Sequence, residues 1–171
     1  MSIVLYRVDE RLIHGQVVLG WGSQLRPTRY IVVDDELSES EWEQDLYQLG
    51  AGDAEAIFVS VSQCRKLLAG WQSDPVRSIL LTRDLGSMLA LAEGGLMSEE
   101  RVNLGGLHHG PGREQVLTYL HLTQEDREAL RALGEEVASV SARDLPDANK
   151  VSLKSLVGSG WSSCFSPWWG A

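Results

Sequence analysis

Cysteine is scarce in this chain, because its 171 residues contain only Cys64 and Cys164. The two do not have the spacing of a zinc or redox site, which argues against a disulfide-stapled or metal-binding fold. We therefore expect reduced thiols in a cytoplasmic protein, and neither a metal nor a cofactor.

Long hydrophobic runs and an excess of basic residues are also missing. No apolar stretch approaches the ~20 residues that a membrane-spanning helix needs, and the first residues have neither the basic leader nor the apolar length of a signal peptide. Lysine and arginine together number 15 against 24 aspartates and glutamates, and the net charge is −9. This balance argues against a nucleic-acid partner, since no basic patch is present to bind a polyanion.

Strand-like and helix-like segments alternate along the chain, which is long enough for one domain with a full core. Short apolar strands separated by single helices predict an α/β fold with an open, mostly parallel sheet and helices on both faces. A turn-rich segment at 105–113, in place of a helix, predicts an antiparallel hairpin near the C-terminal end. The expected strands are 3–6, 31–33, 56–61, 79–81, 102–104, 116–122 and 137–141, and the expected helices are 16–24, 38–49, 62–71, 85–92 and 123–133.

Local signals predict several helix ends. Ser38 and Glu41 have the spacing of a capping box. Thr123 is placed as an N-cap, followed by acidic residues in the first turn, where negative charge is favoured. Gly94 and Gly95 predict the end of the helix at 85–92.

Residues 7–17, Arg-Val-Asp-Glu-Arg-Leu-Ile-His-Gly-Gln-Val, carry the strongest functional signal. His14 lies where the first strand gives way to a helix, so free backbone N–H groups and the positive end of the helix dipole converge there. An imidazole at this point can act as a nucleophile toward phosphorus. The amides of Gly15, Gln16 and Val17, together with a guanidinium, can then hold the phosphate, and Gly15 lets the backbone approach it closely.

Two arginines, Arg7 and Arg11, flank His14. Asp9 and Glu10 would repel a phosphate, so either one of them orients the ring or an arginine, or both pair with the arginines and only shape the loop. In either case one arginine has to remain free enough to bind phosphate. A lone histidine at a helix start is most often a plain surface residue, and the surrounding motif argues against that interpretation here.

These eleven residues resemble the active-site loop of the mannose/fructose/sorbose family of IIB components of the bacterial phosphoenolpyruvate-dependent sugar phosphotransferase system. The family pattern is Arg, an aliphatic residue, Asp, an acidic residue, then Arg-Leu-Ile-His-Gly-Gln-Val, and every position matches. The resemblance covers roughly residues 2–157. It includes Trp21, the pair Asp34-Asp35 and the segment Asn-Leu-Gly-Gly at 103–106.

The resemblance implies an open α/β sheet, phosphorylation of His14 on Nδ1, and a place for Arg11 in the phosphate-binding loop. It also implies a cytoplasmic IIB component that takes phosphate from a IIA phosphocarrier and passes it to a sugar in a membrane IIC/IID complex. One alternative is a regulatory phosphocarrier that reports its phosphorylation state to a protein partner without serving a sugar transporter. Another is a self-contained nucleotide- or sugar-binding enzyme, against which the missing P-loop and GxGxxG patterns count.

Further polar residues follow strands and are expected at the same edge of the sheet. Asp34 and Asp35 either pair with Arg11, act in acid–base chemistry, or form a solvated strand end. Thr82 either adds N–H groups to the phosphate site, or it or Asp84 serves as a plain N-cap.

The glycine-rich segment 105–113 contains two adjacent histidines, His108 and His109. In a strand they would point to opposite faces, and no third ligand is close in the sequence, so a zinc site is disfavoured. We expect a rim loop whose histidines or Arg113 border the His14 site. His121, within an apolar strand, is expected to be structural.

The last residues, 158–171, form a tail with half of the chain's six tryptophans, after a flexible Gly-Ser-Gly joint. The resemblance stops before this tail, so we divide the chain into a IIB domain at 1–157 and a Trp-rich tail at 158–171. Aromatic residues of this kind favour docking on the chain's own surface, on a second copy in a homo-oligomer, or on a partner. The alternative is an unordered end added outside the family fold.

Overall fold

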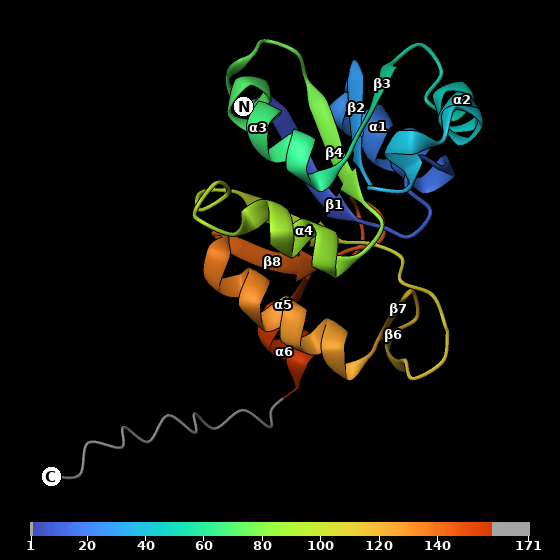
Figure 1. Cartoon of the computed structure of the whole chain (residues 1–171). Helices are drawn as coiled ribbons and strands as arrows, with labels where there is room; N and C mark the ends of the chain where they lie inside the picture. Colours follow the sequence, from blue (N-terminus) through green and yellow to red (C-terminus); the bar gives the residue numbers. More distant parts are fainter. Residues whose placement is uncertain (1, 159–171) are drawn as a thin grey trace, which may run out of the picture.

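A seven-stranded sheet forms the centre of the computed structural model, which describes residues 2–158 (Figure 1). In spatial order its strands are β3 (Glu55–Val59), β2 (Arg29–Val33), β4 (Ser78–Thr82), β1 (Ile3–Val8), β5 (Arg101–Leu104), β8 (Ser139–Ala142) and β9 (Val151–Ser152). Neighbouring strands are parallel except β8 and β9, which are antiparallel. The loops that follow the parallel strands therefore gather at one edge of the sheet.

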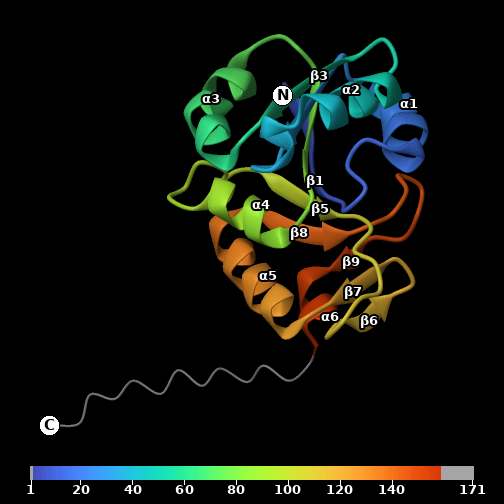
Figure 2. The same ribbon diagram turned by 45° about the vertical axis from the view of Figure 1, so that its right-hand side comes forward.

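Helices cover both faces of this sheet, as the alternating pattern predicts. On one face lie the π-helical turn η1 (Gln16–Trp21), α1 (Gly22–Leu25) and α2 (Glu41–Gly50), and on the other α3 (Val61–Ser73), α4 (Leu85–Ala92), α5 (Gln124–Glu136) and α6 (Leu153–Val157) (Figure 2). A separate hydrophobic cluster fills the space on each face. In β4, Leu80 belongs to one cluster and Ile79 and Leu81 to the other, which explains why the strand is apolar throughout.

Several predicted helix ends are confirmed. α4 has the predicted bounds, and its N-cap is Asp84, whose Oδ1 accepts from the Ser87 amide at 2.7 Å. Thr123 caps α5 in a reciprocal pair of hydrogen bonds with Asp126, both 2.9 Å long. Capping of this kind satisfies amides that the first helical turn leaves free.

The capping box predicted at Ser38 and Glu41 is wrong. The Oδ1 atom of Asp34 accepts from the Leu37 amide at 2.9 Å and begins a 3₁₀ turn, η2 (Leu37–Glu39). Because this turn uses Ser38, whose hydroxyl donates to the Asp35 carbonyl at 2.7 Å, α2 starts only at Glu41. Asp34 thus caps this turn, and the N-cap of α2 is Ser40, whose side chain makes no capping hydrogen bond.

The predicted antiparallel hairpin is confirmed, but its position differs. β6 (Glu114–Leu117) and β7 (Leu120–Leu122) form a separate two-stranded sheet, whereas the sequence pattern predicts one strand at 116–122. Thr118 and Tyr119 form the turn between them. Neither is a residue that typically marks a turn, so the break has no local signal.

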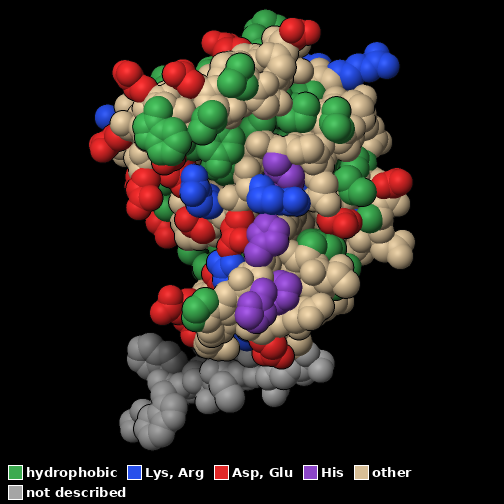
Figure 3. All heavy atoms as spheres, turned by 90° about the vertical axis from the view of Figure 1, so that its right-hand side faces the viewer, with side chains coloured by type: hydrophobic (Ala, Val, Ile, Leu, Met, Phe, Trp, Pro, Cys, Tyr) green, Lys and Arg blue, Asp and Glu red, His purple; other side chains and the backbone are tan. Residues whose placement is uncertain are grey.

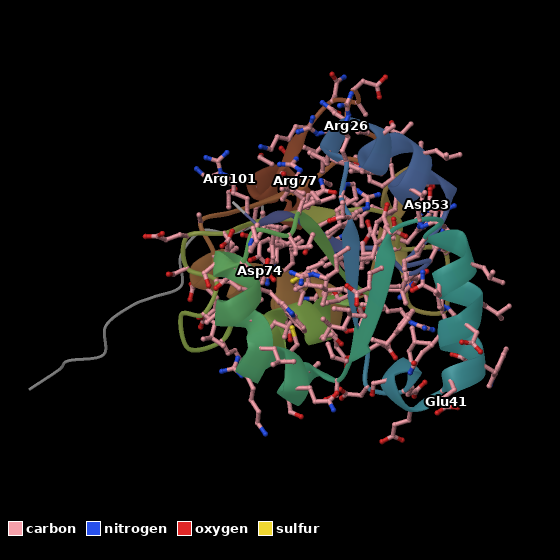
Figure 4. The ribbon with its side chains drawn as sticks, turned by 90° about the horizontal axis from the view of Figure 1, so that it is seen from above. Arg26, Glu41, Asp53, Asp74, Arg77 and Arg101 are labelled. Atoms are coloured by element: carbon pink, nitrogen blue, oxygen red, sulfur yellow. The ribbon has the colours of Figure 1, made fainter. Side chains whose placement is uncertain are left out.

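The opposite edge of the sheet, where the strands begin, contains an arginine–aspartate pair. Arg29 donates to Asp74 Oδ2 and to Ser78 Oγ, each at 2.8 Å, and its guanidinium lies 5.8 Å from the centre of the Trp71 ring. Figure 4 labels Asp74 at the end of α3 and Arg77 near the rim of this edge. The contacts tie the end of α3 to the starts of β2 and β4.

Within residues 2–158, no helix combines the length and the apolar character needed to cross a bilayer. The predicted Trp-rich tail, apart from Gly158, lies outside the described residues.

Candidate functional site

The loop that follows β1 lies near the middle of the carboxyl edge, because β1 is flanked by β4 and β5. Figure 3 looks onto this side of the molecule and shows histidine side chains in a column down the middle of the face. Lysine or arginine side chains lie between and beside them. The fold therefore brings together basic residues that are far apart in the sequence.

A buried arginine–aspartate pair forms the floor of the site. Arg7 and Asp9 are both fully buried, and Arg7 donates from Nη2 and Nε to Asp9 Oδ2 at 3.0 and 3.3 Å. Arg7 also donates to the Asn103 side chain and to the carbonyl oxygens of Arg143 and Asp144 at 2.8 and 3.1 Å. Every N–H of the guanidinium thus has an acceptor. Arg7 joins β1 to β5 and to the segment after β8, and it has no free donor for a phosphate.

Neighbouring residues pack closely around the pair of Arg7 and Asp9. The Arg7 guanidinium lies 5.4 Å from the centre of the Trp21 ring, whose Nε1 donates to the Asp144 carbonyl at 2.9 Å. A Cβ at Gly105 would lie 2.2 Å from Arg7 Nη2 and 2.5 Å from Asp9 Oδ2, so this position requires glycine. Burial lowers the pKa of Arg7, and the neighbouring Asp9 carboxylate opposes that shift.

The Asp9 carboxylate also organises the loop above it. Its Oδ1 accepts from the Arg11 amide at 3.1 Å, and its Oδ2 accepts from the Gly106 amide at 3.2 Å. The His14 Nε2 atom lies 3.8 Å from Oδ2. Asp9 is therefore held by Arg7 on one side and faces the imidazole on the other.

The imidazole of His14 lies between two oxygen acceptors, and its side chain is 14% exposed. Nδ1 is 2.9 Å from the Leu12 carbonyl oxygen, while Nε2 has no hydrogen-bond partner among the described residues. Leu12 has a φ of +54°, a left-handed conformation that is unfavourable for leucine, and its side chain is fully buried. Burial of Leu12 thus holds the backbone in the geometry that turns this carbonyl toward His14.

The start of the helix offers two free amides next to His14. The Val17 amide donates to the His14 carbonyl at 3.0 Å, so it is already used. The amides of Gly15 and Gln16 have no acceptor within residues 2–158. A Cβ on Gly15 would meet nothing within 4 Å, so the space beside these amides is open. An anion can reach this place and use both donors.

Arg11 is the arginine that remains accessible. Its side chain is 43% exposed, and its Nε lies 3.9 Å from Asp9 Oδ1. Its Nη2 donates to Gln16 Oε1 at 2.9 Å, which places the guanidinium beside the free amides. The two arginines of the motif thus differ in kind: Arg7 is enclosed and Arg11 is available.

A second polar group joins the loop to the segment 105–113. Glu10 accepts from the His108 amide and from His108 Nδ1, at 2.9 and 2.8 Å, and it pairs with Arg113. Burial by itself would raise the pKa of Glu10, but the hydrogen bonds from His108 and Arg113 outweigh it and hold the pKa below its ordinary value. The rim loop expected at 105–113 therefore does border the His14 loop, through Glu10.

The aspartates after β2 bind partners other than Arg11. Asp34 Oδ2 lies 3.3 Å from Arg83 Nε, and Asp35 Oδ1 accepts from the Val61 amide at 2.8 Å. Both carboxylates thereby fix the loops around the site without touching His14.

Thr82 lies beneath the loop and is fully buried. Its hydroxyl donates to the Asp84 carbonyl at 3.0 Å, and its carbonyl accepts from the Asp9 amide at 2.9 Å. Thr82 therefore supports the backbone near the site, and Asp84 supplies the N-cap.

Sequence reasoning missed most of the acceptors that hold Arg7. Two of them are backbone carbonyls, of Arg143 and Asp144, which carry no sequence signal because every residue has one. The third is the Asn103 side chain, which the segment Asn-Leu-Gly-Gly at 103–106 could have indicated.

The remaining histidines pack with each other. The rings of His109 and His121 meet edge to face with their centres 5.8 Å apart, and His121 Nδ1 lies 3.2 Å from the Leu107 carbonyl oxygen. In the part of the chain that the structure describes, no group of three or more His, Cys, Asp or Glu side chains is arranged to hold a metal ion.

Fold and site together define a class of domain: a parallel α/β sheet whose first strand leads into a histidine, an accessible arginine and two free amides. Residues 3–162 match the family described as "PTS system sorbose subfamily IIB component", where PTS is the phosphotransferase system. The chain belongs to this family of sugar phosphotransferase components.

Relatives and solved structures agree with this assignment. The fructose-specific EIIB component of Bacillus subtilis (strain 168) is 30% identical over 147 residues, which cover 85% of this chain and 90% of that protein. The mannose-specific EIIAB component of Escherichia coli (strain K12) is 28% identical over 158 residues, 92% of this chain and 49% of that protein. The structure of the IIB domain of the sorbose permease from Klebsiella pneumoniae has a TM-score of 0.80 at 25% identity, with coverage of 90% of this chain and 94% of that one.

Proposed function

We propose that this chain is a phosphoryl carrier and that His14 holds the phosphoryl group. A phosphorylated IIA component donates the group, and a sugar bound in a membrane IIC/IID complex receives it on the cytoplasmic side. One observation carries the proposal: His14 lies at a helix start beside two free amides and an accessible Arg11, above a fixed carboxylate. The fructose- and mannose-specific names of relatives support a sugar as the final acceptor.

The transfer to His14 is balanced without a proton transfer. The donor is a phosphohistidine with a proton on its other ring nitrogen. Its P–N bond breaks as a His14 nitrogen uses its lone pair to form a new P–N bond. The donor leaves as a neutral imidazole with the electron pair of the broken bond, and the other His14 nitrogen keeps its proton. Such a reaction requires in-line positioning and stabilisation of charge on the phosphoryl oxygens more than covalent help from the protein. The two amides and Arg11 are placed to supply that stabilisation.

The family resemblance implies Nδ1 as the attacking nitrogen. Attack through Nδ1 leaves the proton on Nε2, which faces Asp9 Oδ2 at 3.8 Å. The Leu12 carbonyl oxygen, 2.9 Å from Nδ1, accepts a hydrogen bond only from the opposite tautomer, which has its proton on Nδ1. Attack therefore requires the tautomer with the proton on Nε2, and Nδ1 has to leave this carbonyl and turn toward the free amides. In this scheme Asp9 is a positioning residue that keeps the proton on Nε2, and Arg7 keeps Asp9 in place.

The stabilisation available to the phosphoryl group is moderate. A charge-assisted hydrogen bond from Arg11 contributes about 1.5–3 kcal/mol. The helix start contributes about 0.3–1 kcal/mol for a nearby negative charge. Moderate binding suits a carrier, because a phosphate that is held too firmly would not be passed on.

Phosphorylation in the reconstituted relay tests the proposal. The purified chain is incubated with phosphoenolpyruvate, the general phosphotransferase proteins and a IIA component of the mannose/fructose/sorbose family. We expect acid-labile, base-stable label on the wild-type chain and on the His108→Ala and His109→Ala variants, and none on His14→Ala. Full labelling of His14→Ala would overturn the proposal.

A further inference from the structure

An apolar stripe is exposed on α2, beside the His14 loop. Trp42, Leu46 and Leu49 are 67, 58 and 80% exposed, and their spacing of four and three residues places them on one face of the helix. Tyr47, on the inward side of α2, packs against the core. The stripe is therefore not needed to attach the helix to the sheet.

The stripe continues into the candidate site. A surface hollow of about 420 Å³ is lined by Ile13, Trp42, Glu43, Leu46, Tyr47 and Arg83. Ile13 directly precedes His14, and Arg83 belongs to the loop that follows β4. Figure 3 shows hydrophobic side chains gathered on the upper left of the face that also carries the column of histidines. One continuous surface thus includes the stripe, the hollow and the His14 loop.

Charge is distributed unevenly over this surface. Arg11 and Arg83, whose side chains are 43 and 40% exposed, lie at the end near His14. Glu43 and Asp45 lie on the two sides of the stripe, about 100° and 60° around the helix from Trp42. A complementary partner presents an anionic group at the His14 end, apolar side chains over the stripe, and basic side chains at its flanks.

We propose that this surface, made of Trp42, Leu46, Leu49 and the Ile13 hollow, is the docking site of the phosphorylated IIA component. The inference rests on the proposed function. In-line transfer needs the donor phosphorus about 3–3.5 Å from the attacking nitrogen, so the donor protein has to cover the surroundings of His14. The donor brings its own anionic phosphoryl group, which suits the arginines at this end. A second copy of this chain fits less well, because a symmetric contact would bring the same acidic flanks together.

Kinetics with matched variants test the docking site. Trp42→Ala and Leu46→Ser should each raise the KM for the phosphorylated IIA component by about tenfold or more and change kcat little, since a central exposed tryptophan or leucine acts through binding. Leu67→Ser is the matched control: Leu67 is 47% exposed on α3, which covers the other face of the sheet. It should leave KM unchanged. Unchanged KM in both stripe variants, or an equal rise in the control, would overturn the proposal.

Chemical phosphorylation separates this inference from the proposed function. Phosphoramidate is a small phosphoryl donor that needs no docking surface, so it should label His14 equally in the wild type and in the stripe variants. Failure to label wild-type His14 by either donor would contradict the proposed function itself. Normal transfer from IIA with loss of transfer to sugar would assign the stripe to the membrane subunits instead. A wild-type dimer that the stripe variants abolish, seen by sedimentation velocity with normal transfer from IIA, would assign it to a second copy.

Discussion

Two arginine–aspartate pairs occupy opposite edges of the same sheet, and each lies against a tryptophan. At the carboxyl edge, Arg7 pairs with Asp9 and lies 5.4 Å from the Trp21 ring. At the amino edge, Arg29 pairs with Asp74 and lies 5.8 Å from the Trp71 ring. The pairs differ in what surrounds them: Asp9 is fully buried beneath the His14 loop, whereas the Asp74 side chain is 28% exposed.

The difference in burial indicates a different role for each ion pair. A fully buried ion pair gains little net stability, because desolvation of both charges offsets their attraction. The pair at the carboxyl edge is nevertheless complete, with an acceptor for every N–H of Arg7 and contacts from Asp9 to Arg11 and Gly106. Its effect is to fix the loop that carries His14. The pair at the amino edge has access to water and joins secondary-structure elements only.

Removing one partner from each pair should show the largest contrast. Arg7→Met leaves the Asp9 carboxylate buried without its cation, so we expect a loss of about 3–5 kcal/mol in the free energy of unfolding. Arg29→Met leaves Asp74 able to contact water, and we expect a smaller loss of about 1–3 kcal/mol. Urea denaturation measures both, and equal losses would contradict the distinction between the two edges.

A methyl group at Gly105 should disturb the carboxyl edge directly. In Gly105→Ala the added Cβ overlaps Arg7 and Asp9, so we expect a destabilisation of about 1–3 kcal/mol and slower transfer to His14. Gly70→Ala, in α3, is the matched control, because a Cβ at this position meets nothing within 4 Å. Thermal denaturation measures the stability of both variants, and transfer assays measure the rate of phosphorylation of His14. Wild-type stability of Gly105→Ala would contradict the close packing of Gly105 against Arg7 and Asp9.

Arg11 should affect transfer and leave the fold intact. Because the Arg11 side chain is 43% exposed, Arg11→Ala should change the free energy of unfolding little. The lost charge-assisted hydrogen bond should slow phosphoryl transfer by about 10- to 100-fold. Arg11→Lys should recover only part of the rate, since an ammonium lacks the planar fork of a guanidinium. Wild-type transfer rates for Arg11→Ala would show that Arg11, like Arg7, only supports the loop.

Glu10 should contribute a small, pH-dependent stabilisation. Its pKa is lower in the folded protein than the ordinary 4.5, so the contribution is present above pH 4.5 and is lost as the pH falls through the lowered value. Compared with Glu10→Gln, the wild type should be more stable by about 0.2–1 kcal/mol at pH 7. Denaturation at several pH values measures this difference, and a difference that grew below pH 4.5 would have the wrong sign.

Much of the fold could be predicted from the sequence, because parallel strands buried on both faces give continuous apolar runs such as Ile79-Leu80-Leu81. Helix N-caps could also be predicted where a single residue determines the start of the helix, as at Thr123. The start of α2 was missed because Asp34 caps a separate turn, η2, which includes Ser38 and ends just before the helix. The turn at Thr118 was missed because tertiary pairing of β6 with β7, and not turn chemistry, defines it.

The sequence predicted which residues belong to the site better than it predicted what each residue does there. The motif places His14, Arg11 and the helix start together, since they are neighbours in sequence. It does not distinguish Arg7 from Arg11, because their burial depends on Trp21, Gly105 and backbone carbonyls far along the chain. The docking stripe is likewise invisible as a site, because Trp42, Leu46 and Leu49 have the spacing of an ordinary core-facing helix stripe.

NMR of the phosphorylated, ¹⁵N-histidine-labelled chain identifies the nitrogen atom that carries the phosphorus. We expect one phosphorylated imidazole, that of His14, with phosphorus on Nδ1 and the proton on Nε2 facing Asp9, while the nitrogen shifts of His109 and His121 stay unchanged. Phosphorus on another histidine, or on Nε2 of His14, would contradict this expectation.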